Sequence, residues 1–147
     1  MRRLALDTQL YVGAIRDGQS LAALRGFLEK AGMAVWGLSI VAEELLSGST
    51  SSAMFEMINR LAIAPFEQHG RVLTPDHEAW KAAGLATSRL RQARRMTTLS
   101  DASTNDLLIA ATCAREEVTL ITKNTSDFER IATVLPFSFA DPWPGLA

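Results

Sequence analysis

Acidic or amide residues recur along this chain where a predicted strand passes into a predicted helix. These residues are Asp7, Glu44, Asp106, Asn124 and Asp127. Strand-to-helix junctions of a parallel sheet share its carboxyl edge, so side chains that are distant in sequence meet there. Carboxylates brought together repel one another, and a hard divalent cation such as Mg²⁺ commonly offsets that repulsion. The pattern therefore predicts a parallel α/β fold with a metal-dependent site at one edge of its sheet.

Short apolar runs alternate with segments of helical spacing over the whole chain. The predicted strands cover residues 4–6, 34–38, 71–73, 118–122 and 136–139. The predicted helices cover residues 21–31, 39–46, 54–61, 76–94 and 103–114, and residues 126–129 open a short last helix. This alternation indicates a three-layer α/β/α fold with a central, mostly parallel sheet.

Several residues with strong boundary preferences mark the ends of these helices. Caps are predicted at Ser39, at Thr74 before Pro75, and at Ser126. Pro65 is expected to stop the helix before it. Ser103 stands three residues before Asp106 in a capping-box pattern. Because the helix that follows is almost wholly apolar, we expect it to pack against the sheet with Asp106 at the carboxyl edge.

The length and composition suit one domain over residues 1–147. Apolar residues make up 48% of the chain and charged residues 21%, which is enough to bury a core. The net charge is −1 and the isoelectric point about 6.1, so the chain has no overall attraction to nucleic acid. A local basic patch or a bound metal could still provide one.

The sequence is that expected of a cytoplasmic protein. Its single cysteine, Cys113, cannot form an internal disulfide and lies in an apolar setting that indicates a buried thiol. No apolar run approaches the ~20 residues of a membrane helix. Asp7 comes too early for the apolar region of a signal peptide.

Each candidate position also has a plain structural explanation. Asp7 and Asp106 could cap helices, Asp127 could be a favourable charge in a first helical turn, and Asn124 could be a turn residue. Glu44 and its neighbour Glu43 point ~100° apart on one helix, so only one of the two is expected to face the site. Their common placement on one predicted edge favours a functional role.

Six segments together resemble the PIN-domain family, in particular the small VapC-type toxins of bacterial toxin–antitoxin pairs. The segments are Leu6-Asp7-Thr8, Ser39, Glu44-Leu45-Leu46-Ser47-Gly48, Asn105-Asp106-Leu107-Leu108-Ile109-Ala110-Ala111-Thr112, Leu120-Ile121-Thr122-Lys123-Asn124-Thr125-Ser126-Asp127-Phe128, and Pro142-Trp143. The resemblance runs in order over residues 4–143. It is most specific in the segments around Asp106 and Asn124, and only general over residues 49–97.

The resemblance implies a metal-dependent endoribonuclease that hydrolyses single-stranded RNA and leaves a 5′-phosphate. The implied ligands of Mg²⁺ or Mn²⁺ are Asp7, Glu44 and Asp106, and the implied catalytic set adds Asn124 and Asp127. The family's Glu-Leu-x-x-Gly register fits Glu44 and not Glu43. Gln9 stands where the family usually has Asn, which changes the support expected for the Asp7 carboxylate. Asn124 is neutral, which favours one metal ion rather than two.

Basic residues near the predicted edge are candidates for contact with the RNA backbone. Lys123 is one, and the cluster Arg89, Arg91, Arg94 and Arg95 is the other. The cluster could instead only complement a helix dipole.

The resemblance also implies restraint by a cognate antitoxin protein. Met54 and Met57 lie beside a Ser-rich loop, so we expect an apolar groove near residues 49–62 that accepts an amphipathic partner helix. An arginine of that partner could pair with the acids and displace the metal. A homodimer is expected through another face.

Other chemistries find less support in the sequence. His69 and His77 are isolated and lack zinc-site spacing, no Walker-type glycine loop is present, and nothing near Cys113 would activate its thiol. Phosphoryl-aspartate hydrolases need a second acid two residues after the first, where this chain has Gln9. A non-catalytic PIN-like scaffold that binds RNA or protein stays open, because Asn124 is neutral.

Overall fold

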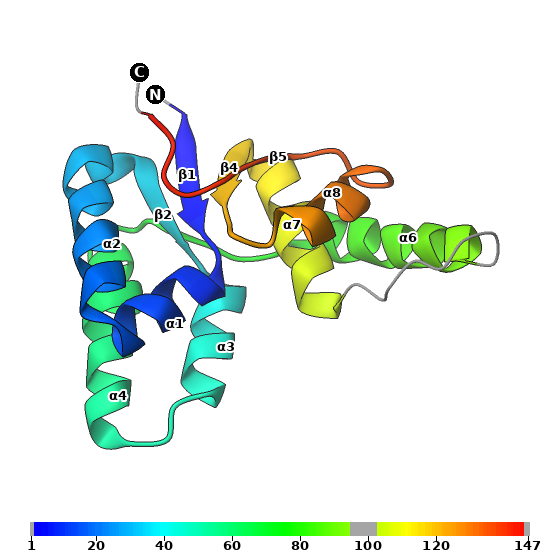
Figure 1. Cartoon of the computed structure of the whole chain (residues 1–147). Coiled ribbons are helices and arrows are strands. Elements are labelled where there is room, and N and C mark those ends of the chain that lie inside the picture. Colours follow the sequence, from blue (N-terminus) through cyan, green and yellow to red (C-terminus); the bar gives the residue numbers. More distant parts are fainter. Residues whose placement is uncertain (1, 95–102, 146–147) are drawn as a thin grey trace.

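The computed structural model describes residues 2–94 and 103–145, in which a five-stranded sheet lies between layers of helices (Figure 1). The strands are β1 (Arg3–Leu6), β2 (Val35–Leu38), β3 (Val72–Leu73), β4 (Val118–Ile121) and β5 (Ser138–Ala140). Their order is β3-β2-β1-β4-β5, and each neighbouring pair is parallel. The predicted three-layer α/β/α fold and its five strands are confirmed.

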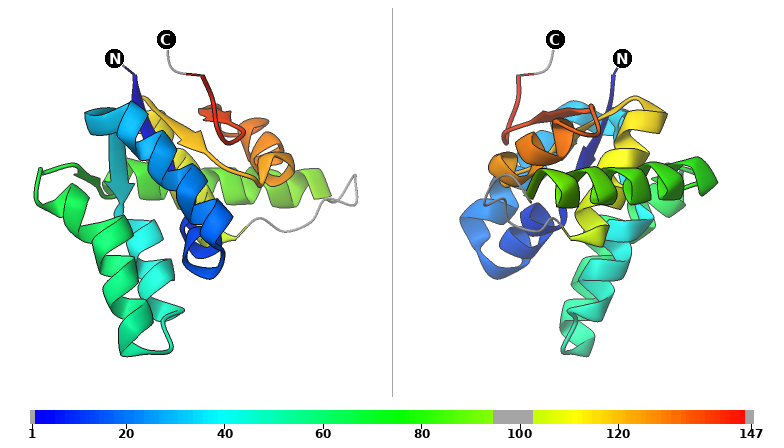
Figure 2. Two further views of the ribbon diagram at one scale, coloured as in Figure 1. Left: turned by 60° about the vertical axis from the view of Figure 1, so that its left-hand side comes forward. Right: turned by 90° about the vertical axis from the view of Figure 1, so that its right-hand side faces the viewer.

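The helices divide between the two faces of this sheet. They are α1 (Thr8–Arg16), α2 (Gly18–Ala31), α3 (Ser39–Ser47), α4 (Ser52–Ile58), α5 (Ala64–Glu67), α6 (His77–Arg94), α7 (Thr104–Glu116) and α8 (Thr125–Ala132), with single turns η1 (Gly32–Ala34) and η2 (Asn59–Ile63). In Figure 1, α2 and α4 lie on the left, α1 and α3 lie below the strands, and α6, α7 and α8 lie on the right, and Figure 2 shows the arrangement from two other sides. Right-handed crossovers produce this division, because the chain moves outward from β1 in one direction through β2 and β3 and then returns to β4 on the other side.

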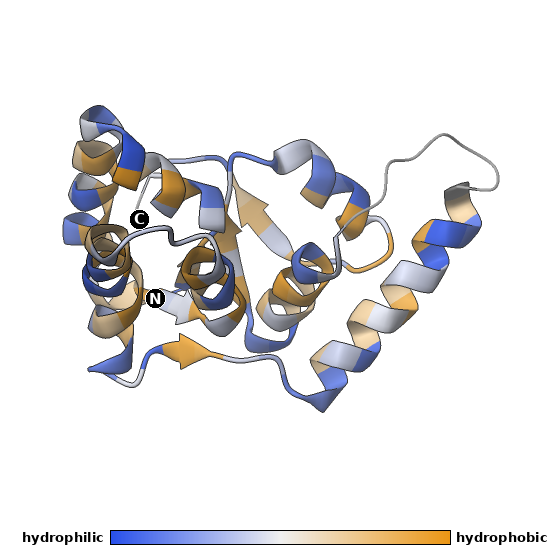
Figure 3. Cartoon of the chain, turned by 90° about the horizontal axis from the view of Figure 1, so that it is seen from below, coloured by the Kyte–Doolittle hydropathy of each residue, from blue (hydrophilic) through white to orange (hydrophobic). Residues whose placement is uncertain are grey.

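The core is apolar on both faces of the central strands. In β1 and β4, Ala5, Leu120 and Ile121 have no exposed surface, as expected for parallel strands covered by helices on both sides. The helix α7 is buried from Leu107 to Cys113, so the predicted packing of this apolar helix into the domain is confirmed. The strands are mostly coloured as hydrophobic in Figure 3, whereas α6 alternates hydrophobic and hydrophilic residues along its length.

The three predicted caps Ser39, Thr74 and Ser126 are wrong, and Ser39 and Thr74 have other partners in the folded chain. Ser39 is the first residue of α3 rather than its cap, and its hydroxyl lies 2.6 Å from that of Thr74. The helix α6 begins at His77, and Asp76 caps it by accepting the Ala79 N–H at 2.8 Å. Arg115 of α7 holds the Asp76 carboxylate at 2.7 Å, a contact that no local pattern reveals.

The other corrections concern Pro65 and Ser126. Pro65 does not end the helical segment, because it falls in the first turn of α5 directly after η2, where its missing N–H costs no hydrogen bond. The helix α8 begins at Thr125, one residue before the predicted cap Ser126, and Asn124 occupies the cap position. No helix within the described ranges combines the length and apolar character needed to cross a membrane.

Candidate active site

The strand order places a topological switch point between the carboxyl ends of β1 and β4. The chain leaves β1 toward β2 on one side, while β4 pairs with β1 on the other, which makes this position the switch point where open α/β sheets bind ligands. Asp7 follows β1 directly. Its backbone N–H donates to the Ile121 carbonyl at 2.9 Å, which fixes the two junctions side by side.

Asp7 is a helix cap and also the central carboxylate of this edge. Its side chain is buried, and Oδ1 accepts the Thr8 N–H at 2.8 Å, as the capping alternative predicted. Its Oδ2 accepts the hydroxyl of Thr122 at 2.7 Å. Burial raises the pKa of Asp7 above its ordinary value, and the hydrogen bonds from Thr122 and Thr8 offset part of that rise.

Of the two neighbouring glutamates, Glu44 is the one that faces Asp7. The Thr8 hydroxyl donates to Glu44 Oε1 at 2.9 Å. Glu43 is exposed, and its Oε1 accepts the Ser47 hydroxyl at 3.1 Å on the same helix. The two side chains also line different hollows, of about 110 Å³ for Glu44 and about 620 Å³ for Glu43.

Asp106 lies in the first turn of α7, where its N–H donates to the Ser103 hydroxyl at 3.1 Å. The predicted cap by Ser103 is therefore confirmed. Burial raises the pKa of Asp106 to about 6, and the negative charges of Asp7, Glu44 and Asp127 add to this rise, while a hydrogen bond with Ser103 opposes it. Asp106 and the three carboxylates that raise its pKa therefore come from four separate segments of the chain.

Asn124 and Asp127 reach the same edge from the start of α8. The Asn124 N–H donates to the Thr122 hydroxyl at 3.0 Å, and its side chain forms no cap bond. Asp127 lies in the first turn and pairs with Arg130 one turn further along. Asp127 therefore adds to the negative charge of the region while part of its own charge is offset.

Sequence reasoning assigned no role to Thr8, Thr122 or Arg130. Thr122 has no exposed surface, and a buried hydroxyl needs a hydrogen-bond partner. Both threonines lie inside the segments that carry the family resemblance, but only their contacts in the folded chain show that they hold Asp7 and Glu44.

The basic residues considered for RNA contact differ in their placement. Lys123, Arg89 and Arg91 are exposed. Hydrogen bonds from Ser20 and Gln19 lower the pKa of Asp17 at the start of α2, and the charge of Lys123 contributes least to that shift. Arg95 and the side chain of Arg94 lie outside the described residues.

The donor atoms at this edge fit a hard divalent cation in chemical type. They are carboxylate oxygens, which Mg²⁺ and Mn²⁺ prefer, and after burial the nearby charges of Asp7, Glu44 and Asp127 contribute to the raised pKa of Asp106. Among residues 2–94 and 103–145, however, no three acidic, histidine or cysteine side chains are placed so that together they could hold a metal ion.

A hollow of the surface lies close to the segment proposed for a partner. A small hollow beside Glu44 is lined by Met54 and Ile58 of α4 and by Val12 and Ile15 of α1, and Phe55 nearby is 50% exposed. This hollow of about 110 Å³ is not lined by Met57, so the apolar groove expected near residues 49–62 stays a prediction. The isolated residues His69 and His77 are exposed.

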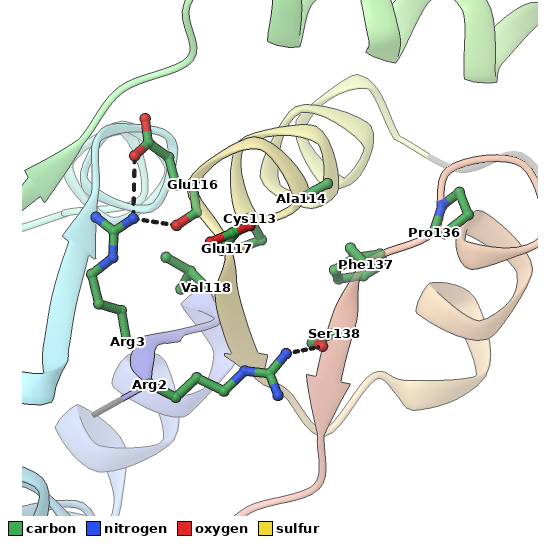
Figure 4. Close-up of a pocket in the computed structure, with 10 residues that line it drawn as sticks. All are labelled: Arg2, Arg3, Cys113, Ala114, Glu116, Glu117, Val118, Pro136, Phe137 and Ser138. Atoms are coloured by element: carbon green, nitrogen blue, oxygen red, sulfur yellow. Dashed lines mark hydrogen bonds and ion pairs between the residues drawn. The ribbon is translucent and has the colours of Figure 1, made fainter.

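Two further features are remote from this chemistry. A hollow of about 800 Å³ opens at the opposite, amino edge of the sheet, where Arg3 pairs with Glu116 and Arg2 bonds to Ser138 (Figure 4). None of the five candidate residues lines it.

Cys113 is buried, and burial raises the pKa of its thiol to about 12, so it is not a nucleophile.

Comparison with known proteins agrees with the fold described above. The family model of the PIN domain matches residues 4–134. Similar solved structures include FitAB bound to a DNA fragment (19% identity, 98% of each chain, TM-score 0.71) and DNA-bound VapBC from Salmonella typhimurium (23% identity, 96% of this chain and 98% of that chain, TM-score 0.71). Another is VapBC2 from Rickettsia felis bound to a fragment of its promoter DNA (26% identity, 96% and 98%, TM-score 0.64). A search of curated proteins found no match.

We expect Asp106→Asn to stabilise the metal-free protein at neutral pH. The folded-state pKa of about 6 exceeds the ordinary 3.8, so ionisation of Asp106 opposes folding. The free energy of unfolding that is lost in this way reaches its full value above pH ~6. It falls to zero as the pH decreases toward ~4, because the carboxyl is then protonated in the folded protein. Urea unfolding in chelator should give a free energy of unfolding about 1 kcal/mol higher than wild type at about pH 7.5, after allowance for solvent screening, and equal values near pH ~4.

Asp17→Asn serves as the control for this experiment, because hydrogen bonds from Ser20 lower the pKa of Asp17. This variant should gain no stability at neutral pH. If Asp106→Asn instead loses stability at both pH values, the carboxylate acts mainly as a structural element of the helix start.

Proposed function

This chain belongs to the PIN-domain family, whose model matches residues 4–134, and we propose that it is a metal-dependent endoribonuclease acting as the toxin of a toxin–antitoxin pair. We take it to act as one domain over residues 1–147 and to work in the cytoplasm, where its RNA substrate is found. The observation that carries the proposal is the placement of Asp7, Glu44 and Asp106 at one edge of the sheet, where Thr8 binds both Asp7 and Glu44 and where burial and the charges of Asp7, Glu44 and Asp127 raise the pKa of Asp106.

Three carboxylates are assigned to the cation and two residues complete the catalytic set. Asp7, Glu44 and Asp106 would hold Mg²⁺ or Mn²⁺, and Asn124 and Asp127 would line the same site. When bound, such an ion supplies an activated water and stabilises the charge that develops on the scissile phosphate. The chain itself orients Asp7 through the donors Thr8 and Thr122, whose hydrogen bonds favour the ionised form.

The charges present favour one cation. Asn124 is neutral, and the charge of Asp127 is partly offset by Arg130. A second ion would therefore have few charged ligands available. Lys123, Arg89 and Arg91, which are exposed, are assigned to the phosphates of single-stranded RNA.

A second function rests on the same residues. Both oxygens of Asp7 already accept hydrogen bonds and Asn124 is neutral, which suits a scaffold that binds RNA or protein without cutting it. Calorimetry with Mg²⁺ separates the two functions, because only the nuclease requires the cation.

An antitoxin partner is supported by the similar structures, whose names are those of paired VapBC and FitAB proteins. The hollow lined by Met54 and Ile58 suits the apolar face of an amphipathic helix. Because Glu44 borders this hollow, an arginine of the partner could pair with the acids from there. A homodimer would then use another face.

The first prediction from this function concerns the metal ligands. Asp7→Asn and Asp106→Asn should each reduce cleavage of single-stranded RNA more than about 100-fold in Mg²⁺, because each removes a charged ligand. Both proteins should stay folded by circular dichroism. Cleavage of 5′-labelled RNA, with product ends tested for a 5′-phosphate and with chelator as the control, measures the effect. Wild-type rates in either variant would remove that residue from the site.

The two adjacent glutamates provide a matched pair of variants. Glu44→Gln should lose at least about tenfold of the cleavage rate and Glu43→Gln little, since Glu44 contacts Thr8 whereas Glu43 contacts only its own helix. Equal losses, or the reverse order, would transfer the ligand role to Glu43.

The antitoxin prediction is tested by affinity capture from the native host. Wild type should co-purify with a small partner protein, and Phe55→Glu should lose it because a charge then enters an apolar surface. Trp80→Glu, a change at another exposed aromatic residue on α6, is the control that should keep the partner. Light scattering reports in parallel whether both variants remain homodimers. If the captured protein brings down only further copies of itself, a nuclease without an antitoxin is favoured.

A further inference from the structure

Thr8 applies its two hydrogen-bond donors to two different acids of the site. Its backbone N–H donates to Asp7 Oδ1 at 2.8 Å, and its hydroxyl donates to Glu44 Oε1 at 2.9 Å. Thr8 itself is buried, with 8% of its surface exposed. A single buried residue therefore connects the carboxylate that follows β1 with the carboxylate on α3.

The direction of these hydrogen bonds is fixed by chemistry. An ionised carboxylate only accepts hydrogen bonds, so the Thr8 hydroxyl proton must point toward Glu44. Thr122 behaves in the same way on the other side of Asp7, because its hydroxyl accepts the Asn124 N–H at 3.0 Å and donates to Asp7 Oδ2 at 2.7 Å. Asp7 is thus fixed at both oxygens, and Glu44 is tied to it through Thr8.

The Thr8 hydroxyl is not required to start α1. Asp7 provides the cap of that helix through the Thr8 backbone N–H, which any residue at position 8 other than proline would supply. Valine has nearly the same shape as threonine, so it removes the hydroxyl while filling the same space. Without this anchor, the flexible Glu44 side chain would regain rotamers that point away from Asp7.

Glu43 and Ser47 form a comparison within the same helix. The exposed Ser47 hydroxyl lies 2.5 Å from the Glu43 carbonyl oxygen, to which it donates, and 3.1 Å from Glu43 Oε1. Each neighbouring glutamate therefore has its own hydroxyl partner, and only the partner of Glu44 also binds Asp7.

We propose that Thr8 is a positioning residue, which holds Glu44 beside Asp7 for cation binding and so selects which of the two neighbouring glutamates serves the site. The inference rests on the proposed metal-dependent function and deepens it. Hydrogen-bonding partners of metal ligands commonly change metal affinity by about 10–100-fold when they are removed.

The test is Mg²⁺ binding to metal-free protein by titration calorimetry. Thr8→Val should bind Mg²⁺ about tenfold more weakly than wild type, Thr8→Ser should restore the affinity, and Ser47→Ala should leave it unchanged. Thermal unfolding in chelator should be nearly the same for all four proteins. In RNA cleavage, Thr8→Val should need about tenfold more Mg²⁺ for half its maximal rate and should keep most of that maximal rate.

A double variant covers the case in which Thr8→Val perturbs folding. In a Glu44→Gln background, Thr8→Val should cause no further loss of Mg²⁺ affinity, because its effect acts through Glu44. Three results would overturn the positioning role and leave the proposed function intact. They are a full additional loss of Mg²⁺ affinity in the double variant, wild-type Mg²⁺ affinity in Thr8→Val, and an equal loss of Mg²⁺ affinity in Ser47→Ala. A wild-type protein that neither binds Mg²⁺ nor cleaves RNA would overturn the proposed function and this inference with it.

Discussion

The parallel pairing of β1 with β4 is the constraint on which the candidate site depends. The register places Leu6 opposite Ile121, and the next residue of each strand then meets at the sheet edge. There the Asp7 N–H donates to the Ile121 carbonyl and the Asp7 carboxylate accepts the Thr122 hydroxyl. Because side chains alternate along a strand, a slip of one residue would turn Thr122 away from Asp7.

Capping a helix and forming an acidic site are compatible roles in this fold. Asp7 caps α1, while Asp106 and Asp127 lie in the first turns of α7 and α8. The positive end of a helix dipole favours negative charge at these positions. The same placement concentrates the acids at one edge, where burial and mutual repulsion raise the pKa of Asp106. Fixed donors and helix ends make the acids tolerable, and a bound cation would neutralise the remaining charge.

The helix α3 connects this chemistry with the surface proposed for a partner. Glu44 borders the hollow formed with α1 and α4, whereas Glu43 borders a separate one near β2 and α5. An occupant of the first hollow would therefore lie beside the acids without passing through the core. The larger hollow at the amino edge, with Arg2 and Arg3, lies at the opposite end of the same strands (Figure 4).

The sequence alone determined the strands, most helices and the junctions at which Asp7, Asp106 and Asn124 lie, because apolar periodicity and capping preferences are local properties. It did not determine the strand order, the cap at Asp76, or the roles of Thr8 and Thr122. Asp76 is held by Arg115, 39 residues further along the chain, and Asp7 is held by Thr122, 115 residues further along. The choice of Glu44 over Glu43 rested on family register alone, and the contact with Thr8 gave it a physical basis. Contacts of this kind exist only after the helices have packed on the sheet, so only the tertiary structure could decide them.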